Sequence, residues 1–108
     1  PNRFPTNFPR FNFMDYPQLT FEKPDRKTFL NLDLAYEAMD LNGTAACALN
    51  AANEITVQAF LESKIGFLDI AKINRKTMQN TGFVANPTYE DFVMVNEEAR
   101  KIALSLIK

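Results

Sequence analysis

Hydrophobic residues recur at helical spacing from residue 28 to the end of the chain. This spacing predicts four or five helices with short connections, which together describe a small all-α bundle. We expect the first two helices over residues 31–41 and 44–63. Gly43 stands at a position typical of a helix C-terminus, and Thr44 is a suitable N-cap for the second helix.

The second half of the chain predicts the remaining helices. A third helix is expected over residues 68–79, with Ile70, Ile73 and either Thr77 or Met78 directed inward. Thr88 is expected to cap a short turn that ends at Val95. Asn96 is a second cap candidate and would begin a last helix. The inward positions of that last helix are Ala99, Ile102, Ala103 and Leu106.

Residues 1–27 have a different pattern, and they form what we call the arm. The arm holds five of the six prolines and five of the ten phenylalanines of the chain. Prolines exclude an ordinary helix, and the residues before them favour extended geometry. So many aromatic residues are unusual for a solvated linker. We therefore expect an extended Pro/Phe-rich arm that lies across another surface, and the helical bundle then occupies residues 28–108.

The expected second helix contains three polar residues among its alanines and aliphatic residues. At 100° per residue, Asn53 falls within a stripe formed by Ala46, Leu49, Val57 and Phe60. Asn50 lies beside that stripe, and Glu54 lies on its border. A neighbouring strip is made of Ala45, Ala48, Ala52 and Ala59, and the solvent side is expected at Ala51, Gln58 and Glu62. A helix this apolar is typically central, so we expect both asparagines to be buried.

Asn50, Asn53 and Glu54 allow a structural and a functional interpretation. In the structural one, the buried amides bind backbone groups at neighbouring helix ends or in the arm, because such groups lack intrahelical partners. In the functional one, the three side chains bind a ligand or metal through oxygen atoms. One carboxylate with two amides is a poor metal site, and no nucleophile or base accompanies them. The pattern favours a structural motif without catalytic, cofactor-binding or metal-binding residues.

Composition narrows the possible functions further. The chain of 108 residues has a net charge of −1, no histidine and one cysteine, Cys47. A disulfide within the chain is impossible, and a zinc site of His and Cys ligands is nearly so. The apolar runs are shorter than the roughly 20 residues of a membrane helix. We expect a protein of a reducing compartment that binds neither nucleic acid nor membrane.

Three other features have chemical alternatives that the composition disfavours. Arg3 and Arg10, set among phenylalanines, could stack on single-stranded nucleic acid, but the chain lacks a basic field. A short basic patch at Lys72, Arg75 and Lys76 is interpreted as a solvated helix face. Cys47 is interpreted as a small packing residue, because no cationic neighbour is evident to lower its pKa.

The motifs of the chain resemble one family, the 1-deoxy-D-xylulose 5-phosphate reductoisomerases, in their carboxy-terminal region. The central match is "LNAANE" at residues 49–54, followed by "AFL" at 59–61 and "IGFLDI" at 65–70. Further matches are "PNR" at the start, "LTFEKPD" at 19–25, "LDLAYEA" at 32–38 and "YEDFVMVNEEAR" at 89–100. The resemblance therefore covers nearly the whole chain.

The resemblance implies a piece of a larger bacterial cytoplasmic enzyme. Members of the family convert 1-deoxy-D-xylulose 5-phosphate to 2-C-methyl-D-erythritol 4-phosphate with NADPH and a divalent cation, magnesium or manganese, in the non-mevalonate isoprenoid pathway. The partners of this chain would be the catalytic and NADPH-binding domains of the same polypeptide, which as a whole would form a homodimer. No catalytic or cofactor residue carries over, so the chain is expected to be inactive alone and to hold no cofactor.

Two alternatives remain at this stage. The chain could be an independent helical module that binds other proteins without any enzymatic context, or it could itself bind NADPH or the sugar phosphate. Its start at Pro1 rather than at a methionine favours an experimental cut. We expect Asn53→Leu to disturb folding rather than ligand binding.

Overall fold

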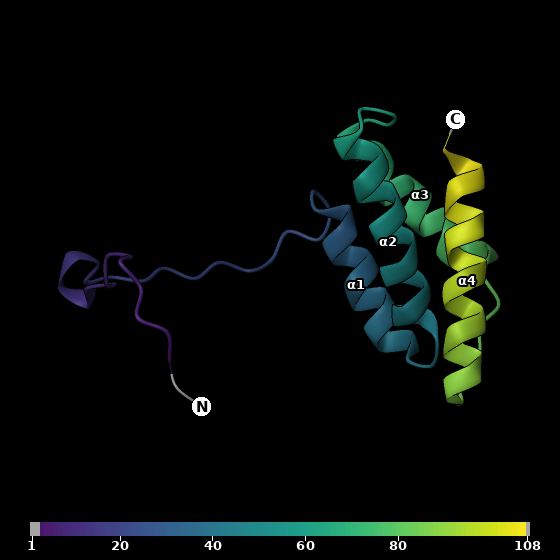
Figure 1. Cartoon of the computed structure of the whole chain (residues 1–108), viewed down its shortest axis with the longest axis horizontal. Helices are drawn as coiled ribbons and strands as arrows, with labels where there is room; N and C mark the ends of the chain where they lie inside the picture. The colour runs from purple at the N-terminus through teal and green to yellow at the C-terminus, as the bar shows by residue number, and fades with distance from the viewer. Residues whose placement is uncertain (1–2, 108) are drawn as a thin grey trace.

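The computed structural model describes residues 3–107, and all regular secondary structure within that range is helical. The four α-helices are α1 (Leu30–Leu41), α2 (Ala45–Leu61), α3 (Phe67–Asn80) and α4 (Tyr89–Leu106). A short 3-10 helix, η1 (Phe13–Asp15), precedes them. Figure 1 shows the four helices packed as one bundle, from which the arm extends away. The expected all-α bundle is confirmed.

The connection between α1 and α2 depends on a glycine and a threonine. Gly43 has a φ of 53°, and a Cβ added there would lie 2.3 Å from the carbonyl oxygen of Val84. Thr44 stands at the N-cap position but makes no side-chain cap bond. Its hydroxyl instead accepts from the Val84 amide at 3.0 Å, and its own amide donates to the Val84 carbonyl at 3.0 Å. The pair of bonds joins the loop before α4 to the start of α2.

Helix α2 is central, as expected, because it packs against α1, α3 and α4. Its buried residues are Ala45, Ala48, Ala51, Ala52, Thr56 and Ala59. Two expectations about its faces were wrong. Ala51, expected on the solvent side, is fully buried, whereas Ala46, Val57 and Phe60 of the expected inner stripe are exposed. Alanines let neighbouring backbones approach closely, so the alanine strip meets the other helices and the bulkier stripe faces outward.

Helix α3 follows the expected pattern. Its buried face consists of Ile70, Ala71, Ile73, Asn74 and Thr77, which confirms the inward direction of Ile70, Ile73 and Thr77. At its start, the Asp69 carboxylate accepts from the Gly66 amide at 3.1 Å. That bond satisfies one of the amides that a helix N-terminus leaves free.

Helix α4 is continuous over 18 residues, so the expected break at Asn96 was wrong. Thr88 caps the whole helix: the Asp91 amide donates to its hydroxyl at 3.3 Å, and its own amide donates to the Asp91 carboxylate at 2.8 Å. Asn96 lies inside the helix, where its side-chain oxygen accepts from Arg100 at 3.2 Å. An asparagine whose side chain binds a residue four positions on does not interrupt a helix that is capped and packed elsewhere. Ala99 and Ala103 are fully buried, as expected.

The arm is anchored at its end next to α1. The Asp25 carboxylate accepts from the amides of Lys27 and Thr28 at 3.0 and 3.1 Å. Arg26 pairs with Asp33 at 2.7 Å and lies 4.7 Å from the ring centroid of Tyr36. These contacts fix the point at which the arm leaves the bundle.

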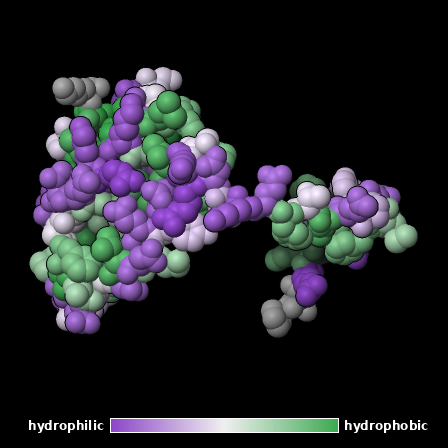
Figure 2. Space-filling model, turned by 180° about the vertical axis from the view of Figure 1, so that it is seen from behind, coloured by the Kyte–Doolittle hydropathy of each residue, from purple (hydrophilic) through white to green (hydrophobic). Residues whose placement is uncertain are grey.

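Farther out, the arm forms a small aromatic cluster around η1. The rings of Phe11 and Tyr16 stack at 5.1 Å, and those of Phe11 and Phe13 meet edge to face at 4.9 Å. All described residues of the arm are exposed. Figure 2 shows the molecule from behind: hydrophilic residues lie across the middle of the bundle, whereas many residues of the outer arm are hydrophobic. Within residues 3–107, the helices are too short or too polar to cross a membrane.

Candidate functional site

The structure divides the three residues that the sequence singled out between two polar networks. Asn50 and Glu54 belong to one on the surface of α2, and Asn53 belongs to one between the helices. Asn50 is exposed and Asn53 is half-buried, so the expectation that both amides are buried was wrong. Positions 50 and 53 are only 60° apart on the helical wheel, and the boundary between exposed and half-buried positions of α2 falls between them.

The surface network joins α2 to α4. The Asn50 amide donates to the Glu54 carboxylate at 3.0 Å, and Glu54 pairs with Arg100. Arg100 also donates to Asn96 at 3.2 Å. The bond from Arg100, followed by the bond from Asn50, lowers the pKa of Glu54 from its ordinary value of 4.5. Glu54 is therefore an ionised partner in a link between helices.

The inner network centres on Asn74 of α3, which is fully buried. Its amide nitrogen donates to Asn53 and to Asn31, each at 3.1 Å, and its oxygen accepts from the Thr56 hydroxyl at 2.9 Å. Both hydrogens of the Asn74 amide are therefore used, and its oxygen is bound as well. The network ties α1, α2 and α3 together through side chains alone. The expected partners of Asn53, backbone groups at helix ends or in the arm, are not the ones that bind it.

Sequence reasoning missed Asn74, although a signal for it existed. Asn74 lies four residues after Ile70 and three before Thr77, so it shares the inward face of α3 with them. A carboxamide on that face must find partners, because an unpaired buried polar group costs about 1–3 kcal/mol. The pattern could therefore have identified Asn74 as a network centre, but it could not have shown that Asn53 is one of its partners.

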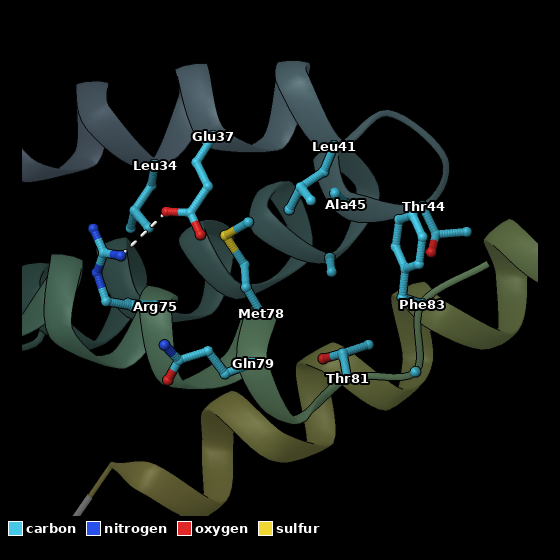
Figure 3. A pocket seen from close by; sticks show the side chains of 12 residues that line it. Leu34, Glu37, Leu41, Thr44, Ala45, Arg75, Met78, Gln79, Thr81 and Phe83 are labelled. Atoms are coloured by element: carbon cyan, nitrogen blue, oxygen red, sulfur yellow. Dashed lines mark hydrogen bonds and ion pairs between the residues drawn. The ribbon is translucent and has the colours of Figure 1, made fainter. Parts of the chain in front are cut away.

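A pocket of about 260 Å³ lies between α1, the start of α2, α3 and the loop at 81–83 (Figure 3). Leu34, Leu41 and Met78 make its apolar walls, and Phe83 closes one end. At the other end, Arg75 pairs with Glu37 at 3.1 Å and with Asp33 at 3.3 Å. Two carboxylates already neutralise this guanidinium, so the pocket does not offer a free cation to a phosphate group.

The described residues favour neither a metal-binding site nor a reactive thiol. Among residues 3–107, no three His, Cys, Asp or Glu side chains are grouped so that they could hold a metal ion. The Cys47 thiol donates to the Phe92 carbonyl at 3.5 Å. Burial raises the pKa of Cys47, against a smaller opposing effect of Arg100. A raised pKa keeps the thiol protonated and unreactive at neutral pH.

The fold and these networks define a helical domain in which amides, a hydroxyl and ion pairs hold the helices together. Comparison with known proteins shows which family this domain belongs to. The family model for the DXP reductoisomerase C-terminal domain matches residues 1–102. The chain belongs to this family, which confirms the resemblance found in the sequence.

Individual relatives agree with the family. The 1-deoxy-D-xylulose 5-phosphate reductoisomerases of Bacteroides thetaiotaomicron and Phocaeicola vulgatus are 49% and 47% identical to the chain over 107 residues. A solved structure of the Zymomonas mobilis reductoisomerase in complex with NADPH superposes with a TM-score of 0.81 at 42% identity. In each comparison the alignment covers 99% of this chain but only 27% or 28% of the relative. The chain thus spans little more than a quarter of the length of these relatives.

Proposed function

We propose that the chain is the carboxy-terminal helical domain of an NADPH-dependent 1-deoxy-D-xylulose 5-phosphate reductoisomerase of the non-mevalonate isoprenoid pathway. The observation that carries this proposal is coverage: relatives with that name match 99% of the chain but only 27% or 28% of their own length. The role of the domain is structural. It braces the catalytic part of the polypeptide, and the Asn50–Glu54–Arg100 and Asn53–Asn74 networks keep the bracing helices in register.

The cofactors of the proposed enzyme belong elsewhere in the polypeptide. The described residues do not fit a divalent cation, because no three potential ligands among them are suitably grouped. They do not fit NADPH either, because the three glycines of the chain form no glycine-rich phosphate loop. We place both sites in the catalytic and nucleotide-binding domains, which precede the arm. The complete enzyme is proposed to be a homodimer in the bacterial cytoplasm.

An activity assay tests this proposal directly. The complete polypeptide and the 108-residue chain are each mixed with 1-deoxy-D-xylulose 5-phosphate, NADPH and magnesium, and the loss of NADPH absorbance is followed. We expect turnover by the complete polypeptide alone and no heat of binding when NADPH is titrated into the chain. A complete polypeptide without substrate-dependent NADPH oxidation would disprove the proposal and favour an independent interaction module.

A further inference from the structure

One face of the bundle carries exposed apolar side chains from two neighbouring helices. We call it the α1/α2 face and define it by Ala35, Met39, Ala46, Leu49, Val57 and Phe60. A shallow groove between the two helices runs through it, lined in part by Ala35, Ala46 and Leu49. Met39 is 61% exposed, and Val57 and Phe60 are each 36% exposed. Several exposed apolar side chains on two neighbouring helices favour a face that another structure covers.

Three of the four acidic side chains of α1 and α2 pair with helices outside this face. Asp33 and Glu37 of α1 pair with Arg75 on α3, and Glu54 of α2 pairs with Arg100 on α4. The six defining residues carry no charge. The face therefore offers hydrophobic contact without any ion pair to be broken on docking.

Two amides at the edge of the groove favour a protein surface as the occupant. Asn31 and Asn53 both line the groove. Each uses its side-chain oxygen to accept from the same Asn74 nitrogen, which leaves its NH₂ group for another acceptor. Because Asn74 fixes both orientations, the two donors are preorganised for carbonyl oxygens, the acceptors that a folded protein presents along its backbone.

The arm indicates which protein surface this is. The contacts of Arg26 with Asp33 and Tyr36 hold the arm at the N-terminal end of α1, one of the two helices of the face. The extended residues 3–25 can reach at most roughly 80 Å. Whatever precedes the arm is thus tethered to the face at high effective concentration.

We infer that the α1/α2 face docks onto the folded part of the same polypeptide that precedes the arm. This inference rests on the proposed function, which supplies that preceding part. Docking buries the stripe of Ala46, Leu49, Val57 and Phe60 that the sequence pattern marks as an inner face. It gives the arm a second fixed point, so the arm runs between two joined bodies instead of acting as a free tether.

Cysteine labelling of the complete polypeptide tests the inference. Met39→Cys on the face and Met94→Cys on α4 form a matched pair, since their methionines are 61% and 60% exposed. Each is made with Cys47→Ser, and N-ethylmaleimide incorporation at that peptide is followed by mass spectrometry. We expect Met39→Cys to react at least about tenfold more slowly than Met94→Cys in the folded protein and equally fast in urea. Equal rates in the folded protein would overturn the inference.

A second matched pair tests whether docking restrains the arm. Val57 and Val93 are 36% and 41% exposed, and each is replaced by glutamate in the complete polypeptide. We expect Val57→Glu to speed tryptic cleavage after Arg10 at least about fivefold, while Val93→Glu leaves it unchanged, because undocking exposes the arm. Equal cleavage in both variants would contradict the inference.

Two controls separate the remaining explanations. If protection of Met39→Cys disappears when dilution dissociates the protein in light scattering, a second copy covers the face, and the inference is wrong. NADPH oxidation by the unmodified polypeptide reports on the proposed function independently. An active enzyme with an unprotected face would overturn the docking inference alone, whereas an inactive polypeptide would overturn the proposed function.

Discussion

Asn74 shows how one side chain can join three helices. It is fully buried, and it binds Asn31, Asn53 and Thr56 at 3.1, 3.1 and 2.9 Å. A hydrophobic side chain of similar volume at this position would fill the space, but it could not form hydrogen bonds with the three partners. The polar network therefore fixes the relative positions of α1, α2 and α3 more specifically than hydrophobic packing alone.

Replacement of Asn74 tests this account. We expect Asn74→Leu to lower the free energy of unfolding by about 2–3 kcal/mol, because it removes three hydrogen bonds between helices. Asn53→Leu should cost less, since Asn53 is half-buried and Asn74 keeps its bonds to Asn31 and Thr56. Asn50→Leu on the exposed surface is the control and should change stability by no more than about 0.5 kcal/mol. Urea denaturation followed by circular dichroism measures all three, and equal losses would contradict the central role of Asn74.

Glu54 makes stability depend on acid pH. Its pKa is lowered in the folded state, chiefly by the bond from Arg100, so the unfolded chain binds a proton more readily than the folded one. The stability that this pair contributes is fully present above the ordinary pKa of 4.5 and is lost as pH falls through the lower folded value. We expect Glu54→Gln to reduce the fall in melting temperature between about pH 5 and pH 3. An identical fall in the variant and in the unmodified chain would show that the pair adds no stability.

At the scale of elements, α4 shows that a residue suited to an N-cap does not always begin a helix. Asn96 is a reasonable N-cap by residue type, yet it lies inside a helix that Thr88 caps. We expect Thr88→Ala to lower the free energy of unfolding by about 1 kcal/mol, because it removes the capping hydroxyl. Asn96→Ala is the matched control, with an expected change within about 0.5 kcal/mol. A larger loss from Asn96→Ala would mean that a helix start at Asn96 matters after all.

The turn between α1 and α2 gives a second test at this scale. Gly43→Ala would put a Cβ against the Val84 carbonyl in a backbone of positive φ. We expect it to cost more than about 1 kcal/mol, since both the strain and the displaced loop oppose folding. Gly82→Ala should be tolerated, because its Cβ would meet only the end of the Glu98 side chain at 3.3 Å. Thermal unfolding of the two variants distinguishes them, and equal melting temperatures would contradict this account of the turn.

At the scale of the whole molecule, the arm leaves a large amount of aromatic surface in water. Phe4, Phe8, Phe11 and Phe13 are 92%, 81%, 61% and 72% exposed. We expect the 108-residue chain to bind a hydrophobic dye and to lose most of that binding when these four phenylalanines become serine. Tyr89, Met94 and Leu104 on α4, replaced together by serine, serve as the control. If the control lowers dye fluorescence as much as the arm variant does, the arm is not the exposed binding surface.

Some parts of the fold were predictable because they depend on local patterns. The helical spacing placed α1, α2 and α3, Gly43 indicated the first turn, and Ile70, Ile73 and Thr77 indicated the inner face of α3. It divided α4 at Asn96, although that helix is continuous. The faces of α2 were not predictable in the same way. That helix is apolar around most of its circumference, so periodicity could not say which sides its neighbours would cover.

The sequence by itself determined the first three helices, the contrast between arm and bundle, and the family, because spacing, prolines and local motifs are properties of the chain alone. Only the tertiary structure decided that Asn53 binds Asn74, that Asn50 stays on the surface with Glu54 and Arg100, and that alanines rather than larger residues face the core. Those outcomes depend on which residues distant in sequence meet in space. A helix presents its residues on every side, and only packing against other helices decides which side becomes the interior.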